Sequence, residues 1–357
     1  MEQKNAARFF LGANSKNGFF SLYDSFTDPA AGDFLWIIKG GPGSGKSSFM
    51  KRVGAAAESA GQQAEYILCS GDPDSLDAVY LPEKRVAYVD GTAPHVIEPK
   101  YPGASACYLD FSRFLDKDSL RPALPEIAAL NRRYKALYAE AYALLSAAAA
   151  LRPRSQPRLC SDAAAQTLRR RAESLAVREM RPLKKQGQVR RRFLSAWSCK
   201  GHITLTDTLS AVCERLILMD NALGFGSVAL DLLAAKAAAQ GYDAVVCPDP
   251  LEPEKLEALL LPEIRLGFLA AEDSAALPEL PCRRLRLDAL ALRELPPETR
   301  AALRKRKKES SALLSAATET LAQAKTLHDA LEAVYHPHVD FDGLDALAEE
   351  HIRELFH

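Results

Sequence analysis

The stretch DFLWIIKGGPGSGKSSFMKRVGAAAESAG, residues 33–61, decides how the N-terminal half of this 357-residue chain folds. Residues 33–40 form a short run of apolar, aromatic and β-branched side chains that ends at a glycine, which is typical of a buried strand. A glycine-rich turn follows, and residues 46–60 are rich in helix-forming types up to Gly61. The stretch therefore predicts a strand, a tight turn and a helix in direct succession.

The turn carries the Walker A pattern, GGPGSGKSS at residues 40–48. Its glycines permit positive φ angles, so that successive backbone N–H groups can point into a concavity that fits phosphate oxygens. Lys46 is expected to reach the β- and γ-phosphates and the Ser47 hydroxyl to bind Mg²⁺. We predict a nucleoside triphosphate, ATP, with Mg²⁺ as ligands, held by Gly40, Gly41, Pro42, Gly43, Ser44, Gly45, Lys46, Ser47 and Ser48.

Two more strands are predicted at residues 64–69 and 85–90, and the second of them ends in Asp90. A carboxylate at the C-terminal end of an apolar strand is the Walker B pattern, so Asp90 is the second predicted Mg²⁺ ligand. His95, five residues later, is either a sensor of the γ-phosphate or a structural histidine. Asp72 is a candidate general base, whereas Asp74 is interpreted as the N-cap of a short helix at residues 75–80. The predicted catalytic residues are Lys46, Asp90, His95 and Asp72.

An internal repeat divides the chain. PDSLDAVYLPEKR at residues 73–85 recurs as PEKLEALLLPEIR at residues 253–265, a shift of 180 positions. RFFLGANSKNGFFSLYD at residues 8–24 matches RRFLSAWSCKGHITLTD at residues 191–207 with a shift of 183. We therefore expect two related domains, residues 1–185 and 186–357.

Each copy also contains helical sequence beyond its strands, at residues 125–151 and 161–180 in the first and 297–335 in the second. These are interpreted as helical extensions, with a helix break at residues 152–157. A fourth strand is expected near residues 107–111 and 283–288. The basic run KKQGQVRRR, residues 184–192, is interpreted as a solvated linker rather than a nucleic-acid patch, because no aromatic residue interrupts it.

The second copy has lost the residues that would handle a phosphate. A shift of 180 positions places Gly226 at Lys46, Phe225 at Gly45 and Asp220 at Gly40. The same shift places Ala270 at Asp90 and residues 270–275 at residues 90–95. The second copy is therefore predicted to be a pseudo-NTPase domain that binds no triphosphate. A metal site at His336 and His338 is considered and not favoured, because no further cluster of ligands accompanies them.

The strand, Walker A turn, helix and Walker B strand resemble the P-loop NTPases. The stretches RFFLGAN, KGGPGSGKSS, CSGDPDSLDAVYLPE and VDGTAPH resemble those of a poorly characterised bacterial family of tandem-domain P-loop ATPases. The resemblance implies an α/β fold in which two duplicated P-loop NTPase-like three-layer domains have mainly parallel sheets, each with a helical extension. It also implies ATP and Mg²⁺ as ligands.

The expected function is a Mg²⁺-dependent ATPase that uses the N-terminal site and pairs internally with the degenerate copy. One alternative is a nucleotide or small-metabolite kinase, whose arginine-rich lid would be residues 169–174. Another is a nucleotide-sensing scaffold with negligible turnover.

Composition narrows the remaining possibilities. Lys plus Arg (46) equals Asp plus Glu (46), so no overall charge favours nucleic acid or an acidic membrane, and neither is expected as a partner. No apolar run approaches the length of a membrane span and no leader sequence is recognised. Seven scattered cysteines without C-x-x-C pairs indicate reduced thiols and a cytoplasmic protein.

Overall fold

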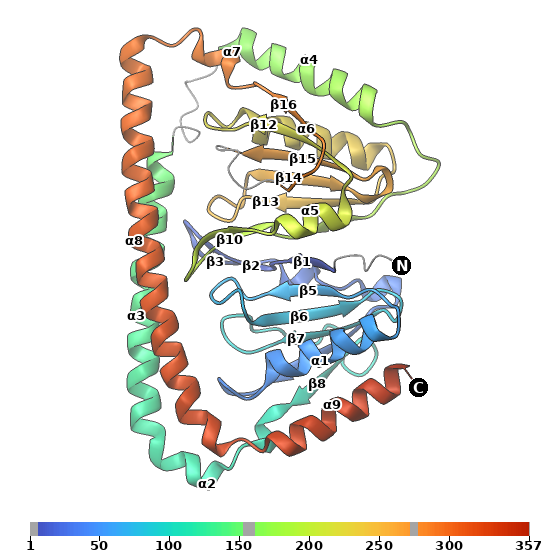
Figure 1. The fold of residues 1–357 in the computed structure, drawn as a ribbon, viewed down its shortest axis with the longest axis vertical. Helices are drawn as coiled ribbons and strands as arrows, with labels where there is room; N and C mark the ends of the chain where they lie inside the picture. The colour runs from blue at the N-terminus through green and yellow to red at the C-terminus, as the bar shows by residue number, and fades with distance from the viewer. Residues whose placement is uncertain (1–5, 153–160, 272–277, 357) are drawn as a thin grey trace.

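A computed structural model of the chain describes residues 6–152, 161–271 and 278–356 (Figure 1). It contains two six-stranded mixed sheets whose strands follow one another in the same spatial order. In the first sheet the order is β1 (Ala7–Phe9), β5 (Glu65–Leu68), β6 (Leu76–Leu81), β7 (Val86–Asp90), β4 (Phe34–Lys39) and β8 (Ala106–Asp110). In the second it is β9 (Val189–Arg191), β13 (Ala244–Pro248), β14 (Leu256–Leu261), β15 (Leu266–Ala271), β12 (Arg215–Asp220) and β16 (Cys282–Leu285).

Both sheets are mostly parallel, and the exceptions are β6 and β14, which run antiparallel to both neighbours. The duplication predicted from the repeat is therefore visible as two similar halves made of a sheet and helices. The short helix expected at residues 75–80 is wrong, because this segment is the buried strand β6. Only short turns connect β6 to β5 and β7, which favours an antiparallel strand over a crossover helix. Asp74 consequently caps no helix.

Long helices cover one face of each sheet. In the first half α1 (Lys46–Ser59) and α9 (Phe341–Phe356) pack on Ile38 and Tyr88. In the second half α6 (Phe225–Ala239) and α4 (Asp162–Glu179) pack around Met219 and Phe268. The opposite faces join one core shared by both halves, where the 3-10 helix Tyr23–Ser25 and α5 (Thr206–Val212) contribute Tyr23 and Leu209. The predicted three-layer domains would have helices on both faces of each sheet. On the inner faces short elements take the place of a second layer of long helices.

The helical extensions are exchanged between the halves. Helix α3 (Leu124–Leu151) leaves the first sheet and runs alongside α8 (Pro297–Tyr335), which descends from the second sheet (Figure 1). Their small side chains allow close packing, since Ala148 and Ala317 are fully buried and the Ser310 hydroxyl donates to the Ala148 carbonyl at 2.8 Å. Beyond this pair, α4 of the first copy packs on α6, and α9 of the second copy packs on α1. Each arm thus completes the hydrophobic core of the other half.

The two sheets meet at their edge strands. Phe10 and Phe193, which occupy matching positions of the repeat, form a reciprocal backbone bridge with N···O distances of 2.9 and 2.8 Å. Two hairpins, β2 (Gly12–Ser15) with β3 (Gly18–Ser21) and β10 (Ser195–Ser198) with β11 (Gly201–Thr204), extend from this junction. The internal pairing of the halves is therefore a packed interface. Each hairpin also touches a loop of the other half: the Lys16 N–H donates to the Leu251 carbonyl after β13, and the Cys199 N–H donates to the Gly71 carbonyl after β5.

The solvated linker predicted at residues 184–192 is partly wrong. Residues 189–191 form the edge strand β9, and Arg192 is only 1% exposed. Its Nε donates to Glu65 Oε1 at 2.7 Å. Burial raises the pKa of Glu65, but Arg192 and Arg190 outweigh it and leave that pKa below its usual value. The basic run thus contributes Arg192 to the interface between the halves, where Glu65 balances its charge.

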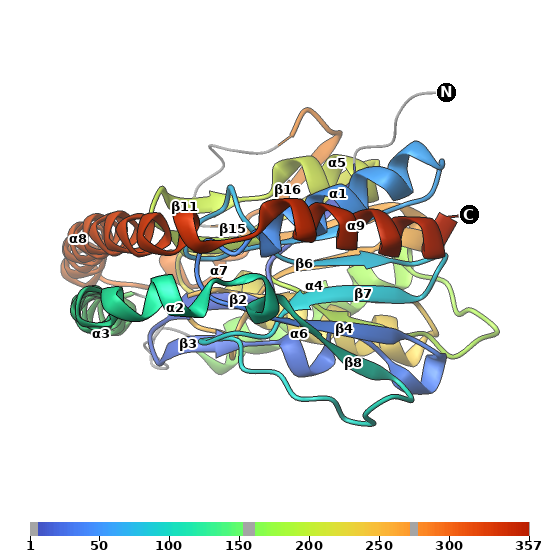
Figure 2. The ribbon, with the colours of Figure 1, turned by 90° about the horizontal axis from the view of Figure 1, so that it is seen from below.

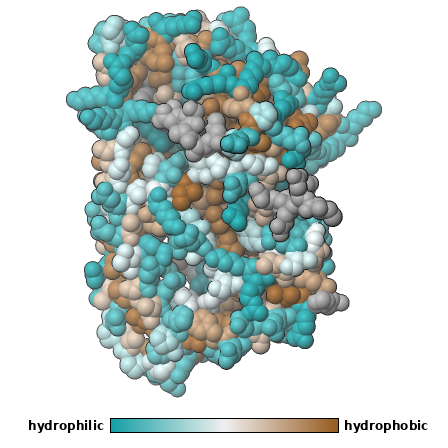
Figure 3. Space-filling model, in the orientation of Figure 1, coloured by the Kyte–Doolittle hydropathy of each residue, from teal (hydrophilic) through white to brown (hydrophobic). Residues whose placement is uncertain are grey.

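Figure 2 shows the α3 and α8 pair beside the sheets, with α9 lying along α1. Hydrophilic residues cover most of the face drawn in Figure 3, with hydrophobic residues in smaller patches between them. None of the described helices combines the length and apolar composition needed to cross a bilayer. The six described cysteines form no disulfide with one another. Residues 153–157 of the predicted helix break, Cys160 and residues 272–275 lie outside the described residues.

Candidate functional site

The glycine-rich loop, residues 40–45, connects β4 to α1 as the sequence predicted. Gly43 and Gly45 have φ angles of +66° and +76°, which other residues adopt only with strain, and Gly45 is the N-cap of α1. The Ser44 hydroxyl closes the turn by donating to the Gly41 carbonyl at 2.7 Å. The backbone N–H groups of Gly43, Ser44 and Gly45 donate no hydrogen bond to another described residue. Free N–H groups next to a helix N-terminus are suited to an anion.

Lys46, the first residue of α1, lies over this loop. Its Nζ donates to the Gly41 carbonyl at 2.8 Å and lies 3.5 Å from Asp90 Oδ2. Asp90 reaches this position because β7 pairs directly with β4, with Ile38 opposite Asp90. The other oxygen of Asp90 accepts from the N–H and hydroxyl of Thr92 at 2.9 and 2.6 Å, which fixes the carboxylate. The structure thus brings two of the predicted catalytic residues together at the loop.

Ser47 lies one residue further along α1, and its hydroxyl accepts the Leu76 N–H at 2.9 Å. Ser48 is exposed. The loop therefore offers free N–H groups, an ammonium, a hydroxyl and a carboxylate within a few residues. This donor set fits a polyphosphate with a divalent cation, which would take oxygen ligands from Ser47 and Asp90. Bound Mg²⁺ would neutralise phosphate charge, and Lys46 would hold the phosphates in place.

Asp77 on β6 is a polar residue near this site that sequence reasoning missed. It is buried, it accepts the Tyr23 hydroxyl at 2.7 Å, and it lies 3.3 Å from His95 Nε2. Burial raises the pKa of Asp77, with a further contribution from the charge of Asp90. The missed signal was an aspartate inside an apolar segment, LDAVYL, which had been assigned to a helix.

His95 is placed in that buried cluster. Its ring contacts Phe19 and Tyr23 with centroid distances of 5.0 and 4.7 Å, and the residue is 7% exposed. Its Nδ1 is buried without a hydrogen-bond partner among the described residues. These contacts, together with the ion pair to Asp77, favour the structural interpretation of His95.

Asp72, the fourth candidate, lies in the turn after β5. One oxygen accepts the Ser75 hydroxyl at 3.0 Å and lies 3.4 Å from Lys325 Nζ on α8. This contact connects the turn to the exchanged arm rather than to Lys46. Asp74 is at the same turn and pairs with Lys200 of the second hairpin.

The C-terminal end of α8 lies against the glycine-rich loop. A methyl group placed on Gly41 would come within 2.9 Å of the Tyr335 ring, and one on Gly43 within 3.1 Å of the Glu332 carbonyl oxygen. Nearby on α8, His328, Asp329 and Glu332 form a group among the described residues whose ligand atoms lie within 4.8 Å of one another and could hold a metal ion. His336 and His338 are not in that group: His338 contacts the Ser119 hydroxyl, and the His336 ring packs against Phe341 at a tilt of 41°.

In the second copy a shorter loop, residues 221–224, joins β12 to α6. Gly224 is the N-cap of α6 with a φ of +88° and therefore corresponds to Gly45. The sequence alignment was wrong by one position here, because the second loop is shorter. Phe225, the first helical residue, stands in place of Lys46 and is not strained, while Asp220 ends its strand as Lys39 does. The second copy therefore has no lysine at the position of Lys46, as predicted.

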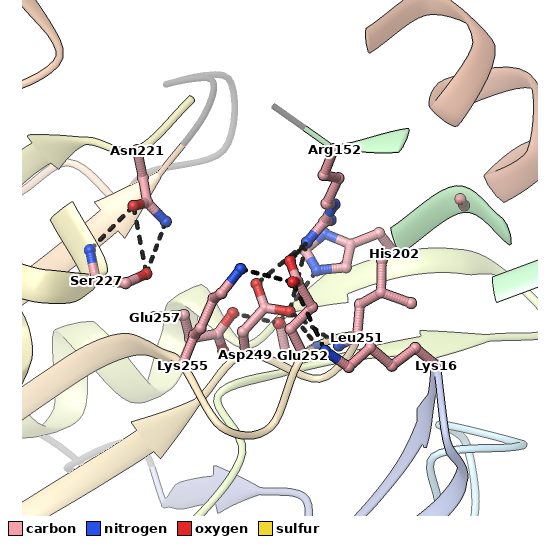
Figure 4. A network of polar contacts seen from close by, with 12 residues as sticks. Lys16, Arg152, His202, Asn221, Ser227, Asp249, Leu251, Glu252, Lys255 and Glu257 are labelled. Carbon is pink, nitrogen blue, oxygen red and sulfur yellow. Dashed lines mark hydrogen bonds and ion pairs between the residues drawn. The ribbon is translucent and has the colours of Figure 1, made fainter. Parts of the chain in front are cut away.

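Side chains of the second half accept hydrogen bonds from backbone N–H groups at this second loop. The Ser227 N–H donates to Asn221 Oδ1 at 2.9 Å, and the Asn221 amide contacts the Ser227 hydroxyl (Figure 4). Asp288 Oδ2 accepts the Leu223 N–H at 3.2 Å. Burial raises the pKa of Asp288 to about 6, although nearby backbone N–H groups lower it.

Two further differences separate the copies. Ala270 on β15 stands opposite Met219, as Asp90 stands opposite Ile38, so the Asp90 carboxylate has no counterpart in the second copy, as predicted. Asp220 pairs with Arg284 at 2.9 Å.

Around the hairpin contact, Arg152 at the end of α3 and Lys16 both reach Glu252, which joins the arm to the second half (Figure 4).

The sequence matches no protein-family model, and neither a curated protein nor a solved structure is significantly similar to it.

Proposed function

We propose that the chain binds ATP with Mg²⁺ at the glycine-rich loop of the first copy and hydrolyses it, whereas the shortened loop of the second copy binds no triphosphate. One observation carries the proposal: Lys46 lies over a loop of free N–H groups and 3.5 Å from Asp90 on the adjacent strand. Lys46 would then supply a mobile cation, and Asp90 a metal ligand, beside a helix N-terminus, where an anion is favoured.

Nucleotide binding would act on the exchanged arm. Tyr335 and Glu332 pack on Gly41 and Gly43, so a triphosphate that reorders the loop changes its contact with α8. Because α8 continues into α9 and runs back to the second half, a displacement at the loop would reach both halves. We therefore favour an ATPase in which nucleotide binding and hydrolysis change the position of the α8 arm.

The kinase alternative receives less support. Its proposed arginine-rich lid, residues 169–174, belongs to α4, which packs on α6 of the second half (Figure 1). A lid must close over the phosphates to exclude water from a transfer reaction. The segment has its contacts on the opposite half from Lys46.

Isothermal titration with Mg²⁺ and a slowly hydrolysed ATP analogue tests the proposal. We expect binding that requires Mg²⁺ and falls about 10- to 100-fold or more in Lys46→Ala, because charge-assisted hydrogen bonds to the phosphates are lost. Lys51→Ala is the matched control, since Lys51 is an exposed lysine one turn further along α1. Unchanged affinity in a folded Lys46→Ala chain would remove the site from this loop.

A further inference from the structure

A cavity of about 430 Å³ lies in the second half between α4, β16 and the β12–α6 region. Its volume falls within the range of small-molecule sites. It is separate from the glycine-rich loop, whose residues contribute nothing to its lining. It is also separate from the shortened loop at Asn221, although Met219 and Ala229 lie at its base.

Arginines dominate its walls. Arg170, Arg171 and Arg178 come from α4, and Arg283, Arg284 and Arg286 come from β16 and the residues after it. None of the described residues lining the cavity is acidic. Arg284 pairs with Asp220 and Arg178 with Glu179. Within the described ranges, no ion pair involves Arg170, Arg171, Arg283 or Arg286, and the only polar side-chain contact among these four joins Arg170 to the Thr167 hydroxyl at 3.4 Å.

Several uncompensated guanidinium groups around one cavity repel each other, and a bound anion relieves that repulsion. The planar guanidinium also matches phosphate oxygens with two parallel hydrogen bonds. The base of the cavity is apolar, with Leu168, Met219 and Leu285 among its residues, so it suits the organic part of a ligand. We propose that this cavity binds a small organic molecule carrying two or more phosphate groups.

The first copy shows that the cavity is not an unavoidable product of the fold. Met50 occupies the position on α1 that Ala229 occupies on α6, counting from Gly45 and Gly224. Tyr108 lies opposite Ile37 where Arg284 lies opposite Leu218. In the first copy the space between sheet and exchanged helix is filled by Phe49, Phe111 and His351, and the Phe49 ring contacts the rings of the other two. The second copy has smaller side chains inside and arginines at the margin.

A ligand in this position would bridge α4, which belongs to the arm of the first copy, and β16 of the second copy. Ligand binding would stabilise the docked position of that arm. The site is thus independent of the proposed ATP site in its residues, although both act on exchanged arms.

The test uses the full-length Lys46→Ala chain with Mg²⁺ removed by chelation, so that binding at the glycine-rich loop is eliminated. Inorganic pyrophosphate and ADP are titrated by calorimetry at low ionic strength. We expect one site per chain that weakens with added salt, with ADP binding more tightly than pyrophosphate if the apolar base contributes. Arg171→Ala and Arg286→Ala should each weaken binding about tenfold or more.

The control is the double variant Arg132→Ala, Arg133→Ala, which removes two exposed arginines of α3 and should leave binding unchanged. Three results overturn the proposal: neither probe binds, binding survives in both cavity variants, or the control weakens it equally. Binding of a single-stranded oligonucleotide but not of the small probes, with the same arginine dependence, would assign the surface to nucleic acid instead. Mg²⁺-dependent binding by the wild-type chain reports separately on the proposed ATP site.

Discussion

Asp90 touches Lys46 on one side and Thr92 on the other, so its carboxylate is held in place by the protein itself. Its proposed task differs from that of Lys46, because a metal ligand positions Mg²⁺ whereas the lysine contacts the phosphates. We expect Asp90→Asn to retain nucleotide binding within about tenfold and to lose Mg²⁺-dependent phosphate release by about 10- to 100-fold. Binding is measured by titration and turnover by phosphate release. Wild-type turnover in Asp90→Asn would move the metal site elsewhere.

Asp288 gives a stability prediction in the second half. Its pKa is raised from 3.8 to about 6 by burial, so the folded state disfavours the charged form. The stability that the folded state gains while Asp288 is protonated is complete below about pH 4 and is lost as the pH rises through about 6. Asp288→Asn removes the buried charge and keeps an oxygen that can accept the Leu223 N–H.

We therefore expect Asp288→Asn to raise the free energy of unfolding by about 2 kcal/mol at pH 8, below the limit of about 3 kcal/mol that the pKa difference sets. The gain should disappear near pH 4. Urea unfolding at both pH values measures it, with the exposed Asp118→Asn as a control. A gain that does not change with pH would show that Asp288 is not the titrating group.

At the scale of elements, the exchange of α4 and α9 decides which half each helix stabilises. Chain order alone would assign α4 to the first half and α9 to the second, which is the reverse of the observed packing. Leu344 of α9 is 5% exposed and packs with Met50 and Phe49 of the first half. Leu168 of α4 is 2% exposed and belongs to the core of the second half. Each is a buried leucine whose loss leaves a cavity.

We expect Leu344→Ala to destabilise the first half, and Leu168→Ala the second, by about 2–5 kcal/mol each. Amide hydrogen exchange locates the effect: β4 and α1 should lose protection in the Leu344→Ala chain, and β12 and α6 in the Leu168→Ala chain. Loss of protection in the opposite pattern would contradict the exchanged arrangement.

The sequence predicted some elements well because their signals are local. Residues 297–335 form α8 as predicted, and the strand, turn and helix at residues 33–61 follow from apolar patterning and glycine positions. Strands β1 and β6 were missed, since β1 is three residues long and the pattern of β6 also fits a helix. The exchange of arms was beyond sequence reasoning, because both destinations present similar apolar surfaces.

Some residues of the candidate site could likewise be predicted from the sequence, and others could not. Lys46, Ser47 and the glycines lie in one segment, so their proximity could be predicted from spacing. Asp90 could be predicted because parallel strands end at the same sheet edge. Asp77, Tyr335 and Glu332 could not, since they approach from a misassigned strand and from the far end of the chain.

For the whole molecule, the central question is how many triphosphates one chain binds. The second copy keeps a glycine N-cap at Gly224 and a helix start, but Phe225 replaces Lys46 and Ala270 replaces Asp90. Asn221 and Asp288 also accept backbone N–H groups that a phosphate would need. Restoring a single residue therefore leaves the other obstacles in place.

We expect a slowly hydrolysed ATP analogue with Mg²⁺ to saturate at about one per chain, with the whole Mg²⁺-dependent signal lost in Lys46→Ala. The titration is done in an Arg286→Ala background, so that the arginine-lined cavity does not add a second anion site. Phe225→Lys in this background should leave the ratio at one, because the Asn221 and Asp288 side chains still occupy the loop. A second Mg²⁺-dependent equivalent that persists in Lys46→Ala would mean that the second copy binds triphosphate, and the asymmetry between the halves would then lie in turnover rather than in binding.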